Sequence, residues 1–120
     1  MILGINFKKL IRSFRFAFLG VAMILREEHV FKVMFLIAIL VIIAMFYFQL
    51  PLTQKVLLFT IIILVLVLEL INSVVEKVLD FVCSDFNGQI KIIKNMMAGI
   101  VLLASIGAAI VGVMIFSPYF

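Results

Sequence analysis

The segment that decides the fold is VLLFTIIILVLVLELINSVVEKVLD, which runs from Val56 to Asp80. It is apolar up to Leu68 except for Thr60, and the helical pattern then continues through Glu69 without a break. A run of this length and composition is typical of a helix inside a lipid bilayer. Because a carboxylate at membrane depth costs about 2.5 kcal/mol or more on insertion scales, we expect Glu69 to face protein or a wet cavity.

Four polar side chains share one face of this helix, and we call them the polar ladder: Glu69, Asn72, Glu76 and Asp80. At 100° per residue, Glu76 and Asp80 lie about 20° to either side of Glu69, and Asn72 lies about 60° away. One interpretation is structural, because polar side chains stabilise contacts between membrane helices. Three acids and an amide exceed what such contacts need. Their spacing suits a general base beside a divalent-cation site.

The ladder segment ELINSVVEKVLD (69–80) resembles the signature E-[IL]-[IL]-N-[ST]-A-I-E-x-x-V-D of the small prokaryotic diacylglycerol kinase and undecaprenol kinase family. The segment KNMMAGIVLL (94–103) resembles the K-D-x-x-[AG]-[GS]-A-V-L-L segment of the same family. The likeness extends over nearly the whole chain from Phe14 onward. It implies an all-α membrane protein with an N-terminal amphipathic interfacial helix and three transmembrane helices. It also implies a homotrimer whose active sites are shared between protomers.

The same resemblance implies an ATP- and Mg²⁺-dependent kinase that phosphorylates a membrane lipid alcohol, either undecaprenol or diacylglycerol. Glu69 would accept the proton of the lipid hydroxyl, Asn72 would orient Glu69 or the substrate, and Lys94 would neutralise charge on the transferring phosphoryl group. Glu28 and Glu76 would hold the metal ion. The family further implies four residues that contact the nucleotide: Lys91, Lys94, Asn95 and Asp80.

Three segments are more similar to the undecaprenol branch: SFRFAFLG (13–20), ELIN (69–72) and AGIVLL (98–103). Two residues depart from the family pattern. Met34 stands where relatives often carry Glu or His, and Asn95 stands where they carry Asp. Because an amide keeps the shape of Asp but loses its charge, we expect attenuated catalysis. The alternative is a degenerate homologue that serves as a membrane scaffold or lipid binder. A cation channel or transporter is less favoured, since only one of the expected helices carries buried acids.

Composition agrees with a membrane protein, since 68% of the 120 residues are hydrophobic and the mean hydropathy is +1.44. The single cysteine, Cys83, excludes an intrachain disulfide, and His29 is interpreted as a solvated residue. Neither a P-loop nor a G-x-G-x-x-G motif occurs, so side chains and Mg²⁺ must hold any phosphate. The net charge of +4 lies at the membrane edges, which favours anionic headgroups and nucleotide phosphate over nucleic acid.

The chain is expected to form one membrane domain in four parts. Residues 1–29 form a basic amphipathic helix in the membrane interface, with no signal peptide to remove. The expected spans are 30–49, 55–82 with a cytoplasmic extension, and 90–117, separated by turns at Pro51 and Asn87–Gly88. The last span offers small residues for close helix contacts: Ala98, Gly99, Ala104, Ser105, Gly107, Ala108, Ala109 and Gly112.

Basic residues set the expected orientation. Nine of the ten lysines and arginines lie in the N-terminal segment and the region from Lys77 to Lys94, and only Lys55 lies in the turn between the first two spans. The positive-inside rule therefore places the N-terminus and the loop near Gly88 in the cytoplasm. We expect a multi-pass protein of the bacterial inner membrane whose polar ladder faces the compartment that contains ATP.

Overall fold

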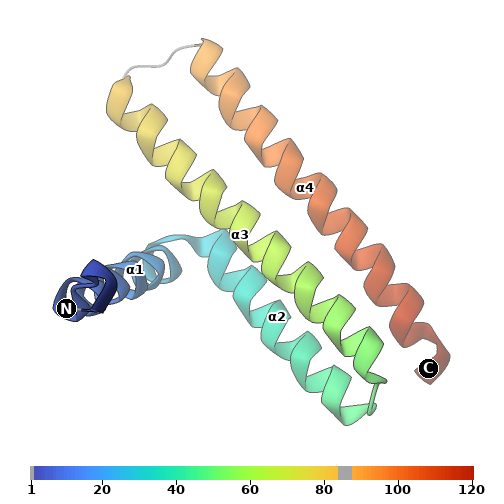
Figure 1. Cartoon of the computed structure of the whole chain (residues 1–120). Helices are drawn as coiled ribbons and strands as arrows, with labels where there is room; N and C mark the ends of the chain where they lie inside the picture. Colours follow the sequence, from blue (N-terminus) through green and yellow to red (C-terminus); the bar gives the residue numbers. More distant parts are fainter. Residues whose placement is uncertain (1, 84–87) are drawn as a thin grey trace.

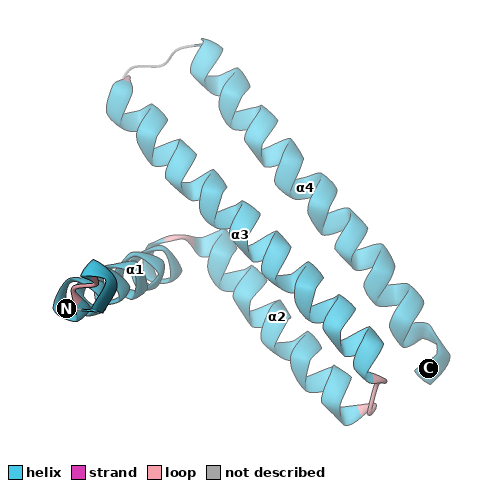
Figure 2. Cartoon of the chain, in the orientation of Figure 1, coloured by secondary structure: helices cyan, strands magenta, loops and turns pink. Residues whose placement is uncertain are grey.

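The computed structural model describes residues 2–83 and 88–120, and every regular element in those residues is a helix (Figures 1 and 2). A short 3-10 helix precedes the long helices and another follows them, and in chain order the elements are η1 Ile2–Gly4, α1 Phe7–Glu27, α2 His29–Tyr47, α3 Leu52–Val82, α4 Gly88–Phe116 and η2 Ser117–Tyr119. Helices α2, α3 and α4 are long and apolar enough to cross a membrane. The predicted all-α membrane class is therefore confirmed.

Helix α3 is the central element of the bundle. It packs most extensively against the antiparallel helix α4, and it also contacts α2 and α1. Helix α2 covers only the first half of α3, so the second half of α3 and the start of α4 extend beyond it (Figure 1). The predicted turn at Asn87–Gly88 falls largely on residues 84–87, which lie outside the described residues, and α4 begins at Gly88.

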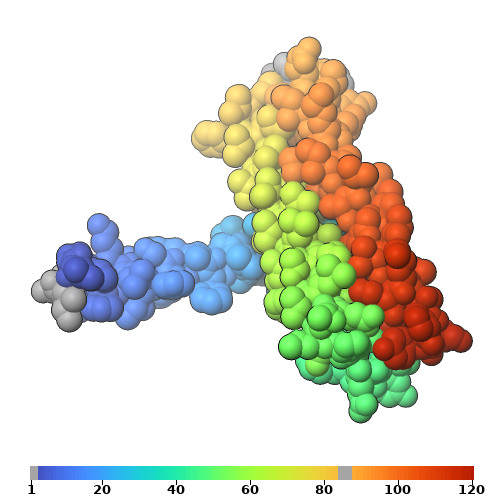
Figure 3. All heavy atoms as spheres, turned by 45° about the vertical axis from the view of Figure 1, so that its right-hand side comes forward, coloured from blue at the N-terminus to red at the C-terminus, as the bar shows by residue number. Residues whose placement is uncertain are grey.

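Helix α1 stands apart from this bundle. Its first turn is capped by Asn6, whose side-chain oxygen accepts a hydrogen bond from the backbone N–H of Lys9 at 3.2 Å. None of its side chains is buried, and the helix projects sideways from the other three (Figures 1 and 3). It ends at Glu27, and the extended backbone of the next residue, Glu28 (φ −95°, ψ 111°), separates α1 from α2. An amphipathic helix in this attitude suits the plane of a membrane interface.

A tight turn joins α2 to α3. The N–H of Leu50 donates to the carbonyl of Met45 at 3.1 Å, and the N–H of Gln49 donates to the carbonyl of Phe46 at 3.2 Å. These two bonds form a Schellman motif, in which Gln49 adopts the left-handed conformation with φ 53°. Pro51 follows at once, and α3 begins at Leu52, three residues before the expected start of the span.

The apolar core sits at the end of the bundle that carries this turn. Four side chains of α2, α3, α4 and the turn form its centre: Met45, Leu50, Leu58 and Ile115. The ring of Phe48 lies 6.1 Å from Phe116, 5.5 Å from Tyr119 and 5.2 Å from Phe120, measured between ring centroids. The last residues of the chain therefore pack over the α2–α3 turn and hold α4 to it.

Three of the small residues of α4 are glycines with open space beside them in one copy of the chain. A Cβ atom added at Gly99, Gly107 or Gly112 would meet no heavy atom of another residue within 4 Å. The space beside these glycines is open, which leaves this part of α4 accessible to a helix from another molecule.

Candidate active site

The polar ladder lies on α3 and becomes more exposed along the helix. Glu69 is 5% exposed and Asn72 is 8% exposed, and Ser73 beside them is also buried. Glu76 is half-buried, and the Asp80 side chain is 66% exposed. The ladder therefore leads from the apolar interior of the bundle to its surface, over about 16 Å of helix axis.

Glu69 and Asn72 form the buried end of the ladder. The side-chain amide of Asn72 interacts with the Glu69 carboxylate. The other polar atom of that amide, Asn72 Oδ1, is buried and has no hydrogen-bond partner among the described residues. A buried acceptor without a partner costs about 1–3 kcal/mol. A hydroxyl group that donates to this oxygen would remove the cost, and it would lie next to a carboxylate.

Two further carboxylates act on Glu69, those of Glu76 and Glu28, and both interact with it electrostatically. Glu76 lies two turns further along α3, whereas Glu28 lies at the break between α1 and α2. The described residues contain no group of three or more His, Cys, Asp or Glu side chains that could hold a metal ion by themselves. Mg²⁺ is usually bound by one or two carboxylates together with substrate phosphates, so the donors Glu28 and Glu76 fit this ion.

Lys94 connects α4 to the exposed end of the ladder. Its Nζ donates to Oδ1 of Asp80 at 2.6 Å, and it also interacts electrostatically with Glu76. Lys91 and Asn95 lie on the same turns of α4 and are exposed. Within the part of the chain that the structure describes, neither is joined to the ladder by a hydrogen bond or an ion pair. The structure therefore brings Lys94 to the carboxylates and leaves the other two α4 residues outside.

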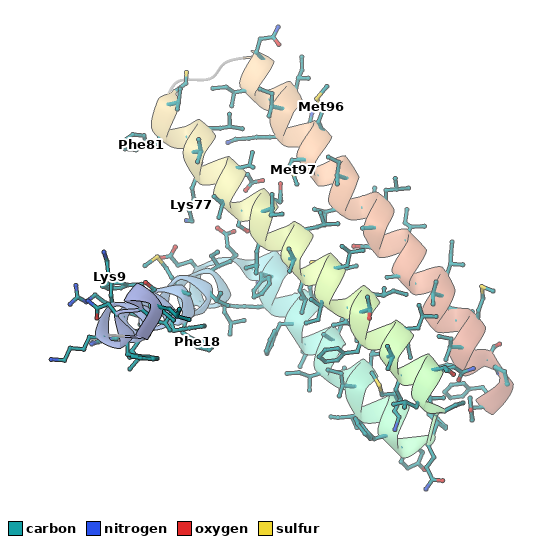
Figure 4. All side chains as sticks on the ribbon, in the orientation of Figure 1. Lys9, Phe18, Lys77, Phe81, Met96 and Met97 are labelled. Atoms are coloured by element: carbon teal, nitrogen blue, oxygen red, sulfur yellow. The ribbon has the colours of Figure 1, made fainter. Side chains whose placement is uncertain are left out.

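Lys77 is a member of the site that the ladder pattern did not include. Its Nζ lies 3.3 Å from Oε2 of Glu27 and 3.7 Å from Oε1 of Glu28. Figure 4 shows its side chain on the side of α3 that faces α1. The sequence offered one indication of this contact, because a lysine directly after Glu76 and an acidic pair at a helix boundary have complementary charge. Their meeting depends on the angle of α1, which no local pattern gives.

An apolar groove of about 780 Å³ lies between α2, α3 and α4. Its lining includes Leu66, which is one turn of α3 before Glu69, and Met34 of α2. From there it extends along the three helices to Phe48 and Phe120 at the other end of the bundle. The buried end of the ladder therefore opens next to a surface that suits a hydrocarbon chain.

Fold and site together define a small helical membrane protein with the Glu69 carboxylate buried in its bundle and with Lys94 and Lys77 near the exposed end of the polar ladder. The family model for prokaryotic diacylglycerol kinase matches residues 15–116 of the chain. The protein therefore belongs to the prokaryotic diacylglycerol kinase family, and the resemblance inferred from 69–80 and 94–103 is confirmed.

A curated relative is a diacylglycerol kinase from Synechocystis sp., which is 36% identical to this chain over 104 residues. The alignment covers 86% of this chain and 59% of the relative, so the chain spans about three fifths of the length of that protein.

Proposed function

We propose that this protein is a lipid kinase, which transfers the γ-phosphate of ATP to the hydroxyl group of a membrane lipid alcohol in lipid metabolism. The observation that carries the proposal is the buried pair of Glu69 and Asn72 on the central helix of a member of this family, in which Asn72 Oδ1 has no hydrogen-bond partner within residues 2–83 and 88–120. A carboxylate kept away from water at this depth is reachable by a hydroxyl group that the membrane itself supplies.

In the proposed reaction the lipid oxygen bonds to the γ-phosphorus of ATP, and the bond from that phosphorus to the leaving oxygen of ADP breaks. Glu69 takes the proton that the hydroxyl group loses. Asn72, whose side-chain amide interacts with the Glu69 carboxylate, orients Glu69 or the substrate for the transfer. A positioned base contributes roughly 10²–10⁴-fold to a rate, which is the share assigned to Glu69.

In this proposal the nucleotide is bound by side chains at the exposed end of the polar ladder. Lys94 leaves Asp80 and neutralises the charge on the transferring phosphoryl group, while Lys91, Asn95 and Asp80 contact the rest of the nucleotide. Glu28 and Glu76 would hold Mg²⁺, which when bound would offset the negative charge of the phosphate groups. Glu28 and Glu76 are close enough to Glu69 to interact with it electrostatically, which supports a single site.

Two lipid alcohols are considered, undecaprenol and diacylglycerol. The segments 13–20, 69–72 and 98–103 favour undecaprenol, whereas the names of the family and of the Synechocystis relative favour diacylglycerol. The groove beside Glu69 accepts a hydrocarbon tail of either kind. We propose undecaprenol as the preferred substrate.

The decisive experiment gives purified protein in mixed micelles labelled ATP and Mg²⁺ with undecaprenol, with diacylglycerol, or with no added lipid. The expected result is labelled undecaprenyl phosphate at a higher kcat/KM than labelled phosphatidic acid. Protein shown to be folded that labels neither lipid contradicts the kinase proposal. In that case the protein is better described as a degenerate homologue that binds lipid or serves as a scaffold, an outcome that Asn95 would explain.

We further propose a homotrimer in the bacterial inner membrane, with the N-terminus in the cytoplasm and sites shared between protomers. The open glycines of α4 support close packing against a second molecule. The test mixes two inactive variants, Glu69→Gln and Lys94→Met, before reconstitution into vesicles. Activity that returns in the mixture, and does not return when each variant is reconstituted separately, supports shared sites. No return of activity in mixed oligomers places the Glu69 and Lys94 of each site in the same protomer.

A further inference from the structure

Lys77 reaches across from α3 to the break between α1 and α2. Its ammonium group contacts two neighbouring carboxylates at once, with Nζ 3.3 Å from Oε2 of Glu27 and 3.7 Å from Oε1 of Glu28. The lysine and Glu27 are half exposed, and the Glu28 side chain is 30% exposed. The lysine also directly follows Glu76 in the sequence. It is thus a cation in contact with Glu28, one of the two side chains to which the proposed function assigns the metal ion.

The Glu28 carboxylate cannot bind the Lys77 ammonium group and a divalent metal ion independently, because the two cations compete for the same oxygens. An ammonium group within ion-pair distance of Glu28 occupies part of the space in front of that carboxylate, and its charge repels a divalent cation that approaches from the same side. A metal ion that binds Glu28 must therefore displace the lysine or bind beside it against this repulsion. Either event weakens metal binding relative to a site without the lysine.

We propose that Lys77 is an internal counter-ion that competes with the divalent cation for Glu28 and sets the metal affinity of the site. The inference rests on the proposed function, because that function assigns Glu28 to the metal. Without metal, Lys77 balances the two adjacent carboxylates at the helix break and keeps Glu28 directed toward α3. With metal, the ammonium group moves to Glu27, which lies beside it already.

The effect can be separated from a general loss of stability. Solvent-accessible ion pairs contribute little to folding stability, so loss of the Lys77 pairs should change the thermal midpoint very little. A lysine charge roughly 6 Å from a divalent cation, in a dielectric close to that of water, changes the dissociation constant of the cation about tenfold. Metal binding and stability therefore respond differently to the same substitution.

The experiment measures Mn²⁺ binding by electron paramagnetic resonance, with the protein in nanodiscs of zwitterionic lipid, with one equivalent of a non-hydrolysable ATP analogue to supply the phosphate ligands, and with no lipid substrate. Lys77→Met should lower the Mn²⁺ dissociation constant about tenfold, and Lys77→Arg, which keeps the charge, should restore a value close to that of the unmodified protein. Lys8→Met is the matched control, because it removes one lysine that lies about 30 Å from Glu28 along the axis of α1. It should leave the dissociation constant unchanged.

An unchanged or raised dissociation constant in Lys77→Met overturns the inference, as does an equal effect of Lys8→Met. Should Lys77→Met fail to fold, Lys77→Gln makes the same change of charge with a polar side chain and is judged by the same outcomes. Protein that binds no Mn²⁺ even without Lys77 overturns the assignment of the metal to Glu28. A Mn²⁺ dissociation constant that does not depend on Lys77 rejects only the counter-ion role of this lysine. The kinase proposal is then still tested by the labelled-lipid assay.

Discussion

At the scale of single residues, Glu69 is distinguished from the other acids by its burial. It is 5% exposed, and next to it Asn72 has one side-chain oxygen with no hydrogen-bond partner among the residues that the structure describes. We expect Glu69→Gln to lower kcat by roughly 10²–10⁴-fold, because the amide keeps the volume of the side chain but cannot take a proton. The measurement is turnover of labelled ATP with lipid at saturating Mg²⁺.

The control for this prediction is Glu27→Gln, which makes the same chemical change at an exposed glutamate outside the proposed catalytic groups. It should keep most of the activity at saturating Mg²⁺. Both variants should show the oligomer size and thermal midpoint of the unmodified protein. Near-normal kcat in a folded Glu69→Gln protein would leave this carboxylate with a structural role between helices.

Asn95 carries the second residue-scale prediction. It is exposed and directly follows Lys94, which pairs with Asp80. A carboxylate at position 95 could orient Lys94 or a metal-bound water through a charge-assisted hydrogen bond, which typically contributes about 1.5–3 kcal/mol. We therefore expect Asn95→Asp to raise kcat roughly ten- to a hundredfold. Equal or lower kcat at saturating Mg·ATP would reject the idea that Asn95 attenuates the enzyme.

Side-chain spacing along one helix could be predicted from the sequence, and contacts between helices could not. Glu69, Asn72 and Glu76 were placed on one face because the helical repeat determines their direction. The contact of Lys77 with Glu28 depends instead on how far α1 turns at the break, which follows from packing. The pairing of Lys94 with Asp80 likewise depends on how α4 lies against α3.

At the scale of secondary-structure elements, the α2–α3 turn places a residue with a side chain in a conformation that favours glycine. Gln49 has φ 53°, and left-handed backbone costs a residue with a Cβ about 1–2 kcal/mol. Gln49→Gly relieves this cost but gives the unfolded chain more freedom, worth about 0.4–1 kcal/mol. We expect a net stabilisation of up to about 1 kcal/mol, measured by reversible unfolding in mixed micelles.

A matched control for this turn is Thr53→Gly, which adds the same residue in the first turn of α3, where the backbone is helical. Glycine there should destabilise the protein by up to about 1 kcal/mol. Destabilisation by Gln49→Gly as well would contradict the role assigned to the left-handed conformation.

Helix boundaries also depend partly on local sequence, which could be predicted, and partly on packing, which could not. Pro51 predicted the turn correctly, because proline cannot continue the preceding helix. The helix nevertheless begins at Leu52, since the Schellman bonds and the burial of Leu50 close the turn within a few residues. Those bonds are accepted by the carbonyls of Met45 and Phe46. The sequence does not mark the motif, because its left-handed position holds Gln49 instead of the usual glycine or asparagine.

At the scale of the whole molecule, the distribution of basic residues predicts which end of the bundle faces the cytoplasm. Cys83 is the single cysteine of the chain and lies at the end of α3 that carries the exposed part of the ladder. A membrane-impermeant thiol reagent should label it in inside-out vesicles and not in intact spheroplasts. As a control, Leu52→Cys in a Cys83→Ser background should give the opposite pattern, because Leu52 lies at the other end of α3. Labelling of Cys83 in spheroplasts would invert the orientation and separate the ladder from cytoplasmic ATP.

The closed turn between α2 and α3 has a consequence for how the chain enters the membrane. Only four residues, 48–51, separate the two helices, and Leu50 within them is buried against the core. No long hydrophilic segment has to cross the bilayer to form this turn. The two helices can therefore partition into lipid together as a hairpin, with the backbone hydrogen bonds of the turn already made. The α2–α3 connection itself is therefore a short hydrogen-bonded turn that offers a protease almost no extended backbone to cleave.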